Sequence, residues 1–174
     1  MNKRTLTSAI IGFIVIVSFI TYMVLRESNV DIKTTIERSL LKQYRENTEI
    51  TIFETFNVTN QHQIIGYILN DTSRKCGFAV IENLNGKYKL KEIKSHEYLV
   101  KRADSIYVQY TFIESAFYRI ILSTNDELSK ISIITEEGVK EYIDVKSNPS
   151  LTIYECSGMN DEYYFLNKFD EIIN

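Results

Sequence analysis

An uncharged stretch of twenty residues near the start, Leu6 to Leu25, constrains this chain more than any other feature. An α-helix of that length is about 30 Å long, which matches the hydrocarbon core of a bilayer. Twelve of its residues are Leu, Ile, Val or Phe, and each favours the membrane centre by roughly 0.3 to 0.6 kcal/mol. The stretch predicts a transmembrane helix, and we expect the lipid bilayer to be contacted through Leu6 to Leu25.

The flanks of this stretch favour an uncleaved anchor over a removed signal peptide. A cleaved signal has a shorter apolar core followed by small residues, whereas large residues and a charge pair occupy Tyr22 to Glu27. Lys3 and Arg4 precede the helix and favour a cytoplasmic N-terminus. Basic residues between Arg26 and Arg45 argue for the reverse orientation. We expect a single-pass protein of the cell membrane, with its N-terminus in the cytoplasm and its C-terminal domain outside.

A short amphipathic helix is predicted after the anchor. Apolar residues recur at every fourth position from Ile32 to Tyr44, and charged residues occupy the other face. Such a stripe packs on a sheet more often than it lies on a membrane surface, and both uses stay open. The chain is therefore divided into a cytoplasmic N-terminus with a transmembrane anchor (residues 1–26), an amphipathic helix (27–48) and a β-rich extracytoplasmic domain (49–174).

From Glu49 onward the apolar period changes to two, which is typical of β-strands. The clearest hairpin joins Cys76–Glu82 to Lys87–Ile93 through Asn83-Leu84-Asn85-Gly86, because Asn-Gly adopts the positive φ angles that tight turns need. Ile64 to Leu69 is nearly continuously apolar and predicts a central strand. Short strands without long helices between them indicate an antiparallel, meandering β domain, so the predicted fold class is mainly β (α+β).

Two expectations concern the side chains of these strands. In the strand from Val139 to Val145 we expect Val139, Ile143 and Val145 to face inward. The tyrosines of the strands are expected to pack in the core or on half-buried faces, and an exposed tyrosine patch that binds a partner stays open. These residues are Tyr107, Tyr110, Tyr118, Tyr142, Tyr154, Tyr163 and Tyr164.

The sequence contains no motif for catalysis, a metal or a cofactor. The two histidines, His62 and His96, both fall in polar turns and are expected to be exposed. An enzyme would need one of them beside Cys156 or a carboxylate, so a non-enzymatic role is predicted. The net charge of −3 argues against nucleic acid, whose binding proteins carry a basic face.

The two cysteines, Cys76 and Cys156, lie in apolar segments that resemble strands. In an oxidising compartment they form a possible disulfide, which would stabilise the fold by roughly 4 kcal/mol. The alternative is two separate buried thiols that behave as small apolar side chains.

The chain resembles a group of known proteins in several stretches. These are the basic start with its apolar span, the helix Ile32 to Tyr44, Gly77-Phe78-Ala79-Val80-Ile81-Glu82 with Gly86-Lys87-Tyr88-Lys89-Leu90, Tyr118-Arg119-Ile120-Ile121 and Ile131-Ser132-Ile133. In these it resembles the uncharacterised single-anchor envelope proteins of low-GC Gram-positive bacteria. The resemblance implies an extracytoplasmic location and assigns no activity and no functional residue.

The leading functional hypothesis is a membrane-anchored, non-enzymatic protein-interaction module of the cell envelope, with another envelope protein as its partner. The alternative is a structural or assembly component, either similar to a minor pseudopilin or a secretion-system scaffold. A pilin precursor carries an acid in its apolar run, and Leu6 to Leu25 contains none. Secretion-system scaffolds carry several helices before the sheet, whereas one such helix is predicted in this chain.

Overall fold

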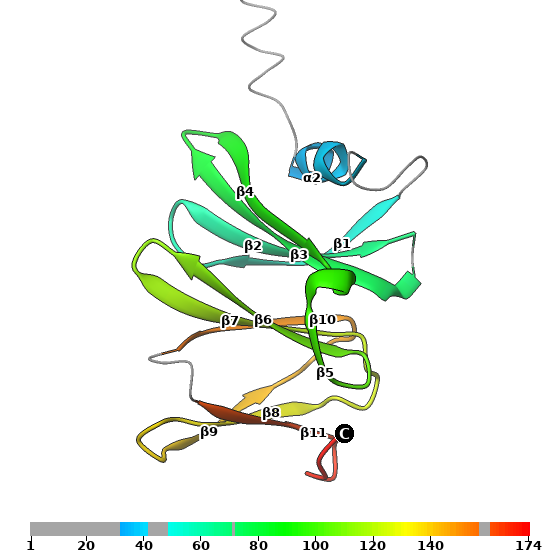
Figure 1. Cartoon of the computed structure of the whole chain (residues 1–174), viewed down its shortest axis with the longest axis vertical. Helices are drawn as coiled ribbons and strands as arrows, with labels where there is room; N and C mark the ends of the chain where they lie inside the picture. The colour runs from blue at the N-terminus through cyan, green and yellow to red at the C-terminus, as the bar shows by residue number, and fades with distance from the viewer. Residues whose placement is uncertain (1–31, 42–48, 71, 157–160) are drawn as a thin grey trace, which may run out of the picture.

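The computed structural model describes residues 32–41, 49–70, 72–156 and 161–174, which stack in four layers (Figure 1). The first layer is helix α2 (Ile32–Leu41), and three antiparallel sheets follow it. Sheet A contains, in spatial order, β1 (Ile50–Asn57), β2 (His62–Leu69), β3 (Thr72–Leu84) and β4 (Lys87–Ser95). Sheet B contains β10 (Ser150–Cys156), β7 (Ala116–Ser123), β6 (Ile106–Ile113) and β5 (Val100–Ala103). Sheet C contains β11 (Glu162–Leu166), β8 (Lys130–Ile134) and β9 (Lys140–Asp144).

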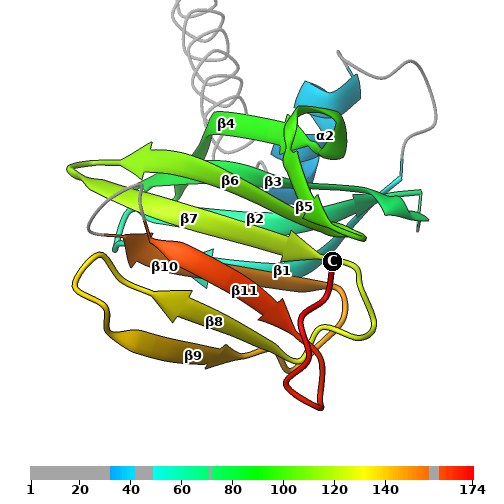
Figure 2. The ribbon, with the colours of Figure 1, turned by 60° about the horizontal axis from the view of Figure 1, so that its bottom comes forward.

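The mainly antiparallel β class predicted from the sequence is confirmed, and the meander holds for only part of the chain. Strands β1 to β4 pair consecutively, as do β5 to β7. A short 3-10 helix, η1 (His96–Tyr98), connects sheets A and B. In contrast, β10 returns to pair with β7, and β11 returns to pair with β8 (Figure 2). These long-range pairs complete sheets B and C, because each sheet gains one strand that is not the next strand along the chain.

Both inner sheets are buried on their two faces, so successive residues of a strand enter different cores. In β2, Ile64 packs between sheets A and B, whereas Ile65 packs between sheet A and α2. In β7, Ile120 packs between sheets A and B, and Ile121 packs between sheets B and C. A strand covered on both sides needs apolar residues at nearly every position. The central position predicted for β2 is confirmed.

Helix α2 lies on the outer face of sheet A, which settles the use of its apolar stripe. Ile36 and Leu40 are fully buried in the core that the helix shares with the sheet, while Arg38 on the other face is exposed. None of the helices within the described residues is long and apolar enough to cross a membrane. The predicted span Leu6 to Leu25 lies outside the described residues.

The hairpin between β3 and β4 forms as the sequence predicts. Asn85 and Gly86 have φ angles of 55° and 83°, and the Gly86 N–H donates a 2.9 Å hydrogen bond to Oδ1 of Asn83. At the other end of the hairpin, Gly77 lies opposite Tyr67, and a Cβ at this position would lie 2.5 Å from the ring Cζ of that tyrosine. Glycine there leaves room for the buried ring.

The inward orientation predicted for Val139 is wrong. Its side chain is 51% exposed, whereas Ile143 and Val145 pack against the core between sheets B and C. Val139 lies in the turn before β9, where the N–H of Thr135 donates a 3.0 Å hydrogen bond to its carbonyl. Val139 has the same odd-numbered alternation as Ile143 and Val145, but the turn places its side chain beyond the end of the core.

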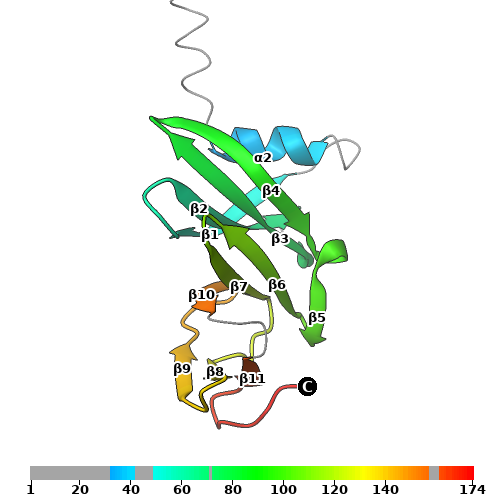
Figure 3. The ribbon, with the colours of Figure 1, turned by 60° about the vertical axis from the view of Figure 1, so that its left-hand side comes forward.

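The two ends of the described chain lie at opposite ends of the stack. Ile32 begins α2 at one end, and the C-terminus lies beside sheet C at the other (Figure 3). Sheet B covers one face of sheet C, and none of the other described layers covers its outer face (Figure 1). This outer face is therefore the sheet surface farthest from α2.

Candidate functional site

The outer face of sheet C contains a hollow of about 440 Å³, which we call the sheet C hollow. It is built mainly from residues of β8, β9 and β11 whose side chains point away from the core, together with two residues of the C-terminal segment. Its lining residues are Lys130, Ser132, Ile134, Lys140, Tyr142, Tyr164, Leu166, Asp170 and Ile172.

The strand register explains the shape of the hollow. Ser132 of β8 lies directly opposite Tyr164 of β11 on one side and Tyr142 of β9 on the other. Neighbouring strands are about 4.8 Å apart, so the backbones of the two tyrosines are about 10 Å apart, with Ser132 between them. Ser132 therefore lies beneath the hollow, between two larger aromatic residues on the neighbouring strands.

The hydroxyl group of Ser132 has no hydrogen-bond partner in the described part of the chain. Ser132 is 1% exposed, and its Oγ has no hydrogen-bond partner among the residues that the structure describes. A buried hydroxyl without a partner is costly, and most such groups are paired in folded proteins. The hydroxyl is therefore enclosed by protein atoms and is not open to solvent at the hollow.

The two lysines of the hollow differ in their charge partners. Nζ of Lys130 lies 2.6 Å from Oδ1 of Asp170, and this hydrogen bond raises the pKa of the lysine. Nζ of Lys140 lies 5.1 Å from the ring centroid of Tyr142, and no carboxylate of the described residues is within ion-pair distance of it. Lys140 therefore forms no direct ion pair with the described residues, and the strand register places Glu162 on the same face, across Ile134.

The two tyrosines of the hollow are more exposed than Tyr67, a tyrosine of the core. Tyr142 is 53% exposed and Tyr164 is 37% exposed, whereas Tyr67 is fully buried. The hydroxyl of Tyr164 donates a 3.1 Å hydrogen bond to Oε2 of Glu162, which raises the pKa of the tyrosine. The expectation that the strand tyrosines pack in the core or on half-buried faces is therefore wrong for Tyr142 and Tyr164, which are exposed on the outer face of sheet C.

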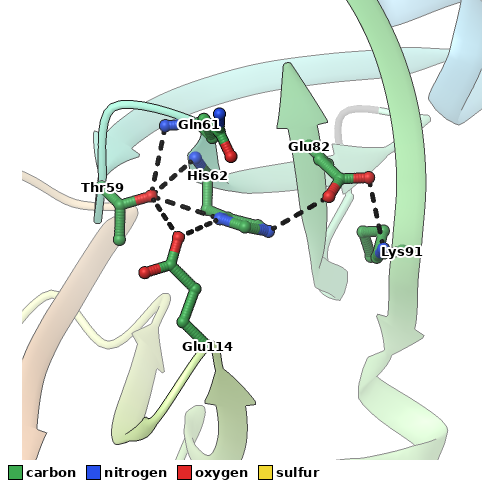
Figure 4. A network of polar contacts seen from close by, with 6 residues as sticks. All are labelled: Thr59, Gln61, His62, Glu82, Lys91 and Glu114. Carbon is green, nitrogen blue, oxygen red and sulfur yellow. Dashed lines mark hydrogen bonds and ion pairs between the residues drawn. The ribbon is translucent and has the colours of Figure 1, made fainter. Parts of the chain in front are cut away.

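His62 lies in a polar network elsewhere in the molecule, and its predicted exposure is wrong (Figure 4). It begins β2 and is 9% exposed, because the ends of sheets A and B enclose it. Its Nδ1 lies 3.2 Å from Oε1 of Glu114, in the turn between β6 and β7, and its Nε2 lies 3.8 Å from Oε1 of Glu82 on β3. Glu82 also pairs with Lys91 of β4 at 3.2 Å. The second histidine of the chain, His96, begins η1.

The enzyme hypothesis required a histidine beside a carboxylate, and His62 does lie beside Glu82 and Glu114. The nearest hydroxyl, that of Thr59, accepts the backbone N–H groups of Gln61 at 3.2 Å and His62 at 3.0 Å, so it serves the turn between β1 and β2. Both imidazole nitrogens face oxygen atoms of the protein (Figure 4). The arrangement holds the ends of sheets A and B together.

The two cysteines are free thiols in the structure, and both are buried. Cys76 packs between sheets A and B, and burial raises its thiol pKa to about 12. Cys156 ends β10, where its thiol donates a 3.5 Å hydrogen bond to the carbonyl of Phe117. Neither lies at the sheet C hollow, and within the described ranges no group of His, Cys, Asp or Glu side chains is placed to hold a metal ion.

One buried cation was not identified from the sequence. Arg119 of β7 is fully buried between sheets B and C, with its guanidinium carbon 4.6 to 5.3 Å from the ring centroids of Tyr110, Tyr154 and Tyr163. The same guanidinium donates to the Tyr154 hydroxyl and, at 3.2 Å, to the backbone carbonyl of Asp161. The only signal for it was a single charged residue in the apolar strand that runs to Ser123.

No protein-family model matches this chain, and no curated protein or solved structure matches it either. The candidate site therefore rests on geometry and chemistry alone.

Proposed function

We propose that this protein is a membrane-anchored, non-enzymatic interaction module of the cell envelope, and that its partner protein binds at the sheet C hollow. The observation that carries the proposal is the exposed pair Tyr142 and Tyr164 on an uncovered sheet face. Tyrosine is enriched at the centres of protein interfaces because it buries a large apolar ring and keeps a polar tip.

The position of the hollow in the stack supports this role. An anchor at Leu6 to Leu25 would join the described fold through α2, and sheet C, whose strands line the hollow, lies at the opposite end of the stack (Figure 3). A domain tethered in this way would present the outer face of sheet C away from its attachment point. A standard interface buries about 800 Å² on each partner, so a partner would also cover the residues around the hollow.

The proposal is tested by placing a photo-crosslinking amino acid at position 142 or 164 of the full-length chain in living cells. We expect a discrete protein adduct from both positions in the membrane fraction, weakened when the other tyrosine is changed to alanine. Position 87 is the matched control, because Lys87 is exposed on the β3–β4 hairpin far from sheet C. Equal adducts from all three positions, no adduct, or recovery of the chain in the soluble fraction would contradict the proposal.

A further inference from the structure

We infer that β9, an edge strand of sheet C, pairs with β9 of a second copy of this chain, so that two three-stranded sheets become one sheet of six strands. This pairing goes beyond the proposed function, because it uses the edge of sheet C rather than its outer face. It follows from the backbone groups at the edge of β9 and from a charge pattern that is complementary to itself.

The backbone of β9 offers hydrogen-bonding groups to a further strand. The N–H of Val145 donates a 2.8 Å hydrogen bond to the carbonyl of Ser129, so the odd-numbered residues of this segment use their backbone groups toward β8. Backbone groups of successive strand residues point to opposite sides. Those of Lys140, Tyr142 and Asp144 therefore point away from β8, and none of the described strands pairs with them.

The edge at β9 is open, whereas the opposite edge of sheet C is partly covered (Figure 2). All residues from Glu136 to Tyr142 are exposed, and so is Asp144. At the opposite edge, the N–H of Ile173 donates a 2.9 Å hydrogen bond to the carbonyl of Phe165, so the C-terminal segment lies along β11. An open strand edge is a template for pairing with another chain.

The charges of β9 select a second copy as that chain. When two copies of the strand run antiparallel with Tyr142 opposite Tyr142, Lys140 of each copy lies opposite Asp144 of the other. Neither residue forms an ion pair within the described ranges, because Lys130, which lies opposite Asp144 on β8, pairs with Asp170 at 2.6 Å. Opposite charges directly across two strands attract each other. The pairing therefore creates two equivalent ion pairs.

The same charges disfavour the other registers. Pairing requires the outward-pointing backbone groups of both copies to meet, so even-numbered residues must lie opposite even-numbered residues. A register centred on Lys140, Glu141 or Asp144 places like charges opposite each other, which is destabilising. A register centred on Ile143 places Asp144 opposite Tyr142 and leaves Lys140 without a carboxylate. The register centred on Tyr142 is therefore favoured.

The pairing would bring the two hollows to one surface. Directly opposite residues of an antiparallel pair have their side chains on the same face, so the outer faces of both copies of sheet C point the same way. A partner protein would then meet two hollows side by side. A strand of five residues buries less than a standard interface, so we expect reversible pairing that crosslinking can trap.

Disulfide crosslinking of the full-length chain in the membranes of living cells tests the register. Opposite residues in a hydrogen-bonded antiparallel pair have Cα atoms about 5.5 Å apart, which suits a disulfide. With copper phenanthroline as the oxidant, Tyr142→Cys should give a linked dimer. Lys140→Cys alone should not, because the two copies of position 140 would be about 14 Å apart. Co-expression of Lys140→Cys with Asp144→Cys should give the dimer.

Controls for this test use positions away from the edge. The native thiols of Cys76 and Cys156 are buried, so the unchanged chain should give no linked dimer. Lys87→Cys places an exposed thiol on the β3–β4 hairpin and should give none either.

A charge exchange tests the ion pairs. In the Tyr142→Cys background, Lys140→Glu should lower the yield of linked dimer about tenfold, because it places like charges opposite each other at both ends of the strand pair. Adding Asp144→Lys in the same chain should restore the yield, since the exchanged charges attract again. Lys87→Glu makes the same charge change on the β3–β4 hairpin and should leave the yield unchanged.

The inference is overturned if Tyr142→Cys gives no linked dimer, if Lys140→Cys alone gives as much, or if the exchanged charges do not restore the yield. The outcome for the proposed function is separate. The two copies of position 164 would be about 24 Å apart across the joined sheet, so a photo-crosslinker there reports a different protein. An adduct from position 164 without the linked dimer would leave the proposed function standing while this inference fails.

Discussion

Cys76 shows at the scale of one residue how burial makes the stability of this fold depend on pH. The folded chain raises the thiol pKa from about 9 to about 12, chiefly because burial disfavours the thiolate. The proton is therefore held more tightly in the folded chain than in the unfolded chain. The resulting contribution to stability is fully present below about pH 9 and is lost as the pH rises toward 12.

We expect Cys76→Ala to reduce the alkaline loss of stability. Between pH 8 and pH 10.5, ionisation of this thiol in the unfolded chain should lower the free energy of unfolding by about 2 kcal/mol. The variant should lack that part of the loss, which urea unfolding of the full-length chain under reducing conditions measures at the two pH values. Cys156→Ala is the matched control and should change the pH dependence less, because Cys156 lies at the end of β10. An unchanged pH dependence in Cys76→Ala would contradict this assignment.

Individual side chains also mark the limit of what the sequence could predict. Tyr142 and Ile143 are neighbours with similar strand preference, yet Tyr142 faces solvent and Ile143 packs against a core. Alternation along a strand assigns neighbouring residues to opposite faces of the sheet. It does not predict which of the two faces another layer covers. His62 illustrates the same limit, because the oxygen nearest to it across the sheets, on Glu114, is 52 positions away in sequence.

At the scale of elements, α2 stabilises the fold through one apolar face. Ile36 and Leu40 are fully buried against sheet A, in a core that also contains Ile65 and Ala79. Helices this short are marginal in isolation, so most of their stability comes from such packing. The helix in turn shields the outer face of sheet A from water.

We expect Ile36→Ala to lower the free energy of unfolding by about 3 kcal/mol, because it removes a buried side chain and leaves a cavity. Arg38→Ala is the matched control on the exposed face of the same helix and should change stability by less than about 0.5 kcal/mol. Chemical unfolding of the full-length variants in nanodiscs measures both values. Equal effects of the two substitutions would mean that α2 does not pack on sheet A in solution.

Elements that depend on local signals were predicted, and elements that depend on distant partners were not. The β3–β4 hairpin follows from Asn85-Gly86, and the central position of β2 follows from its continuous apolar run. In contrast, β10 pairs with β7 although two strands of sheet C lie between them in sequence. The residues of β10 carry no local signal that selects β7 as the pairing partner. The division into three sheets could therefore not be predicted from the sequence.

At the scale of the whole molecule, Arg119 joins sheet C to the rest of the stack. Its guanidinium lies 4.6 Å from the ring centroid of Tyr163 on β11 and donates a 3.2 Å hydrogen bond to the carbonyl of Asp161, directly before that strand. Sheet B contributes Tyr110 and Tyr154 to the same cluster. A buried cation needs such contacts to offset its loss of hydration. Arg119 thus helps to position sheet C, and with it the sheet C hollow, together with the apolar core that sheets B and C share.

We expect Arg119→Ala to loosen sheet C selectively. Removing this side chain should lower the free energy of unfolding by about 3 kcal/mol, because a large cavity opens between sheets B and C. In hydrogen exchange, the amides of β8, β9 and β11 should exchange faster, while those of β2 and β3 should keep their protection as long as the global fold persists. Lys101→Ala, which removes only an exposed ion pair with Asp104, is the control and should leave all amides unchanged. Uniformly faster exchange would mean that the layers unfold as one unit, whereas selective exchange would show that the proposed binding layer has its own stability.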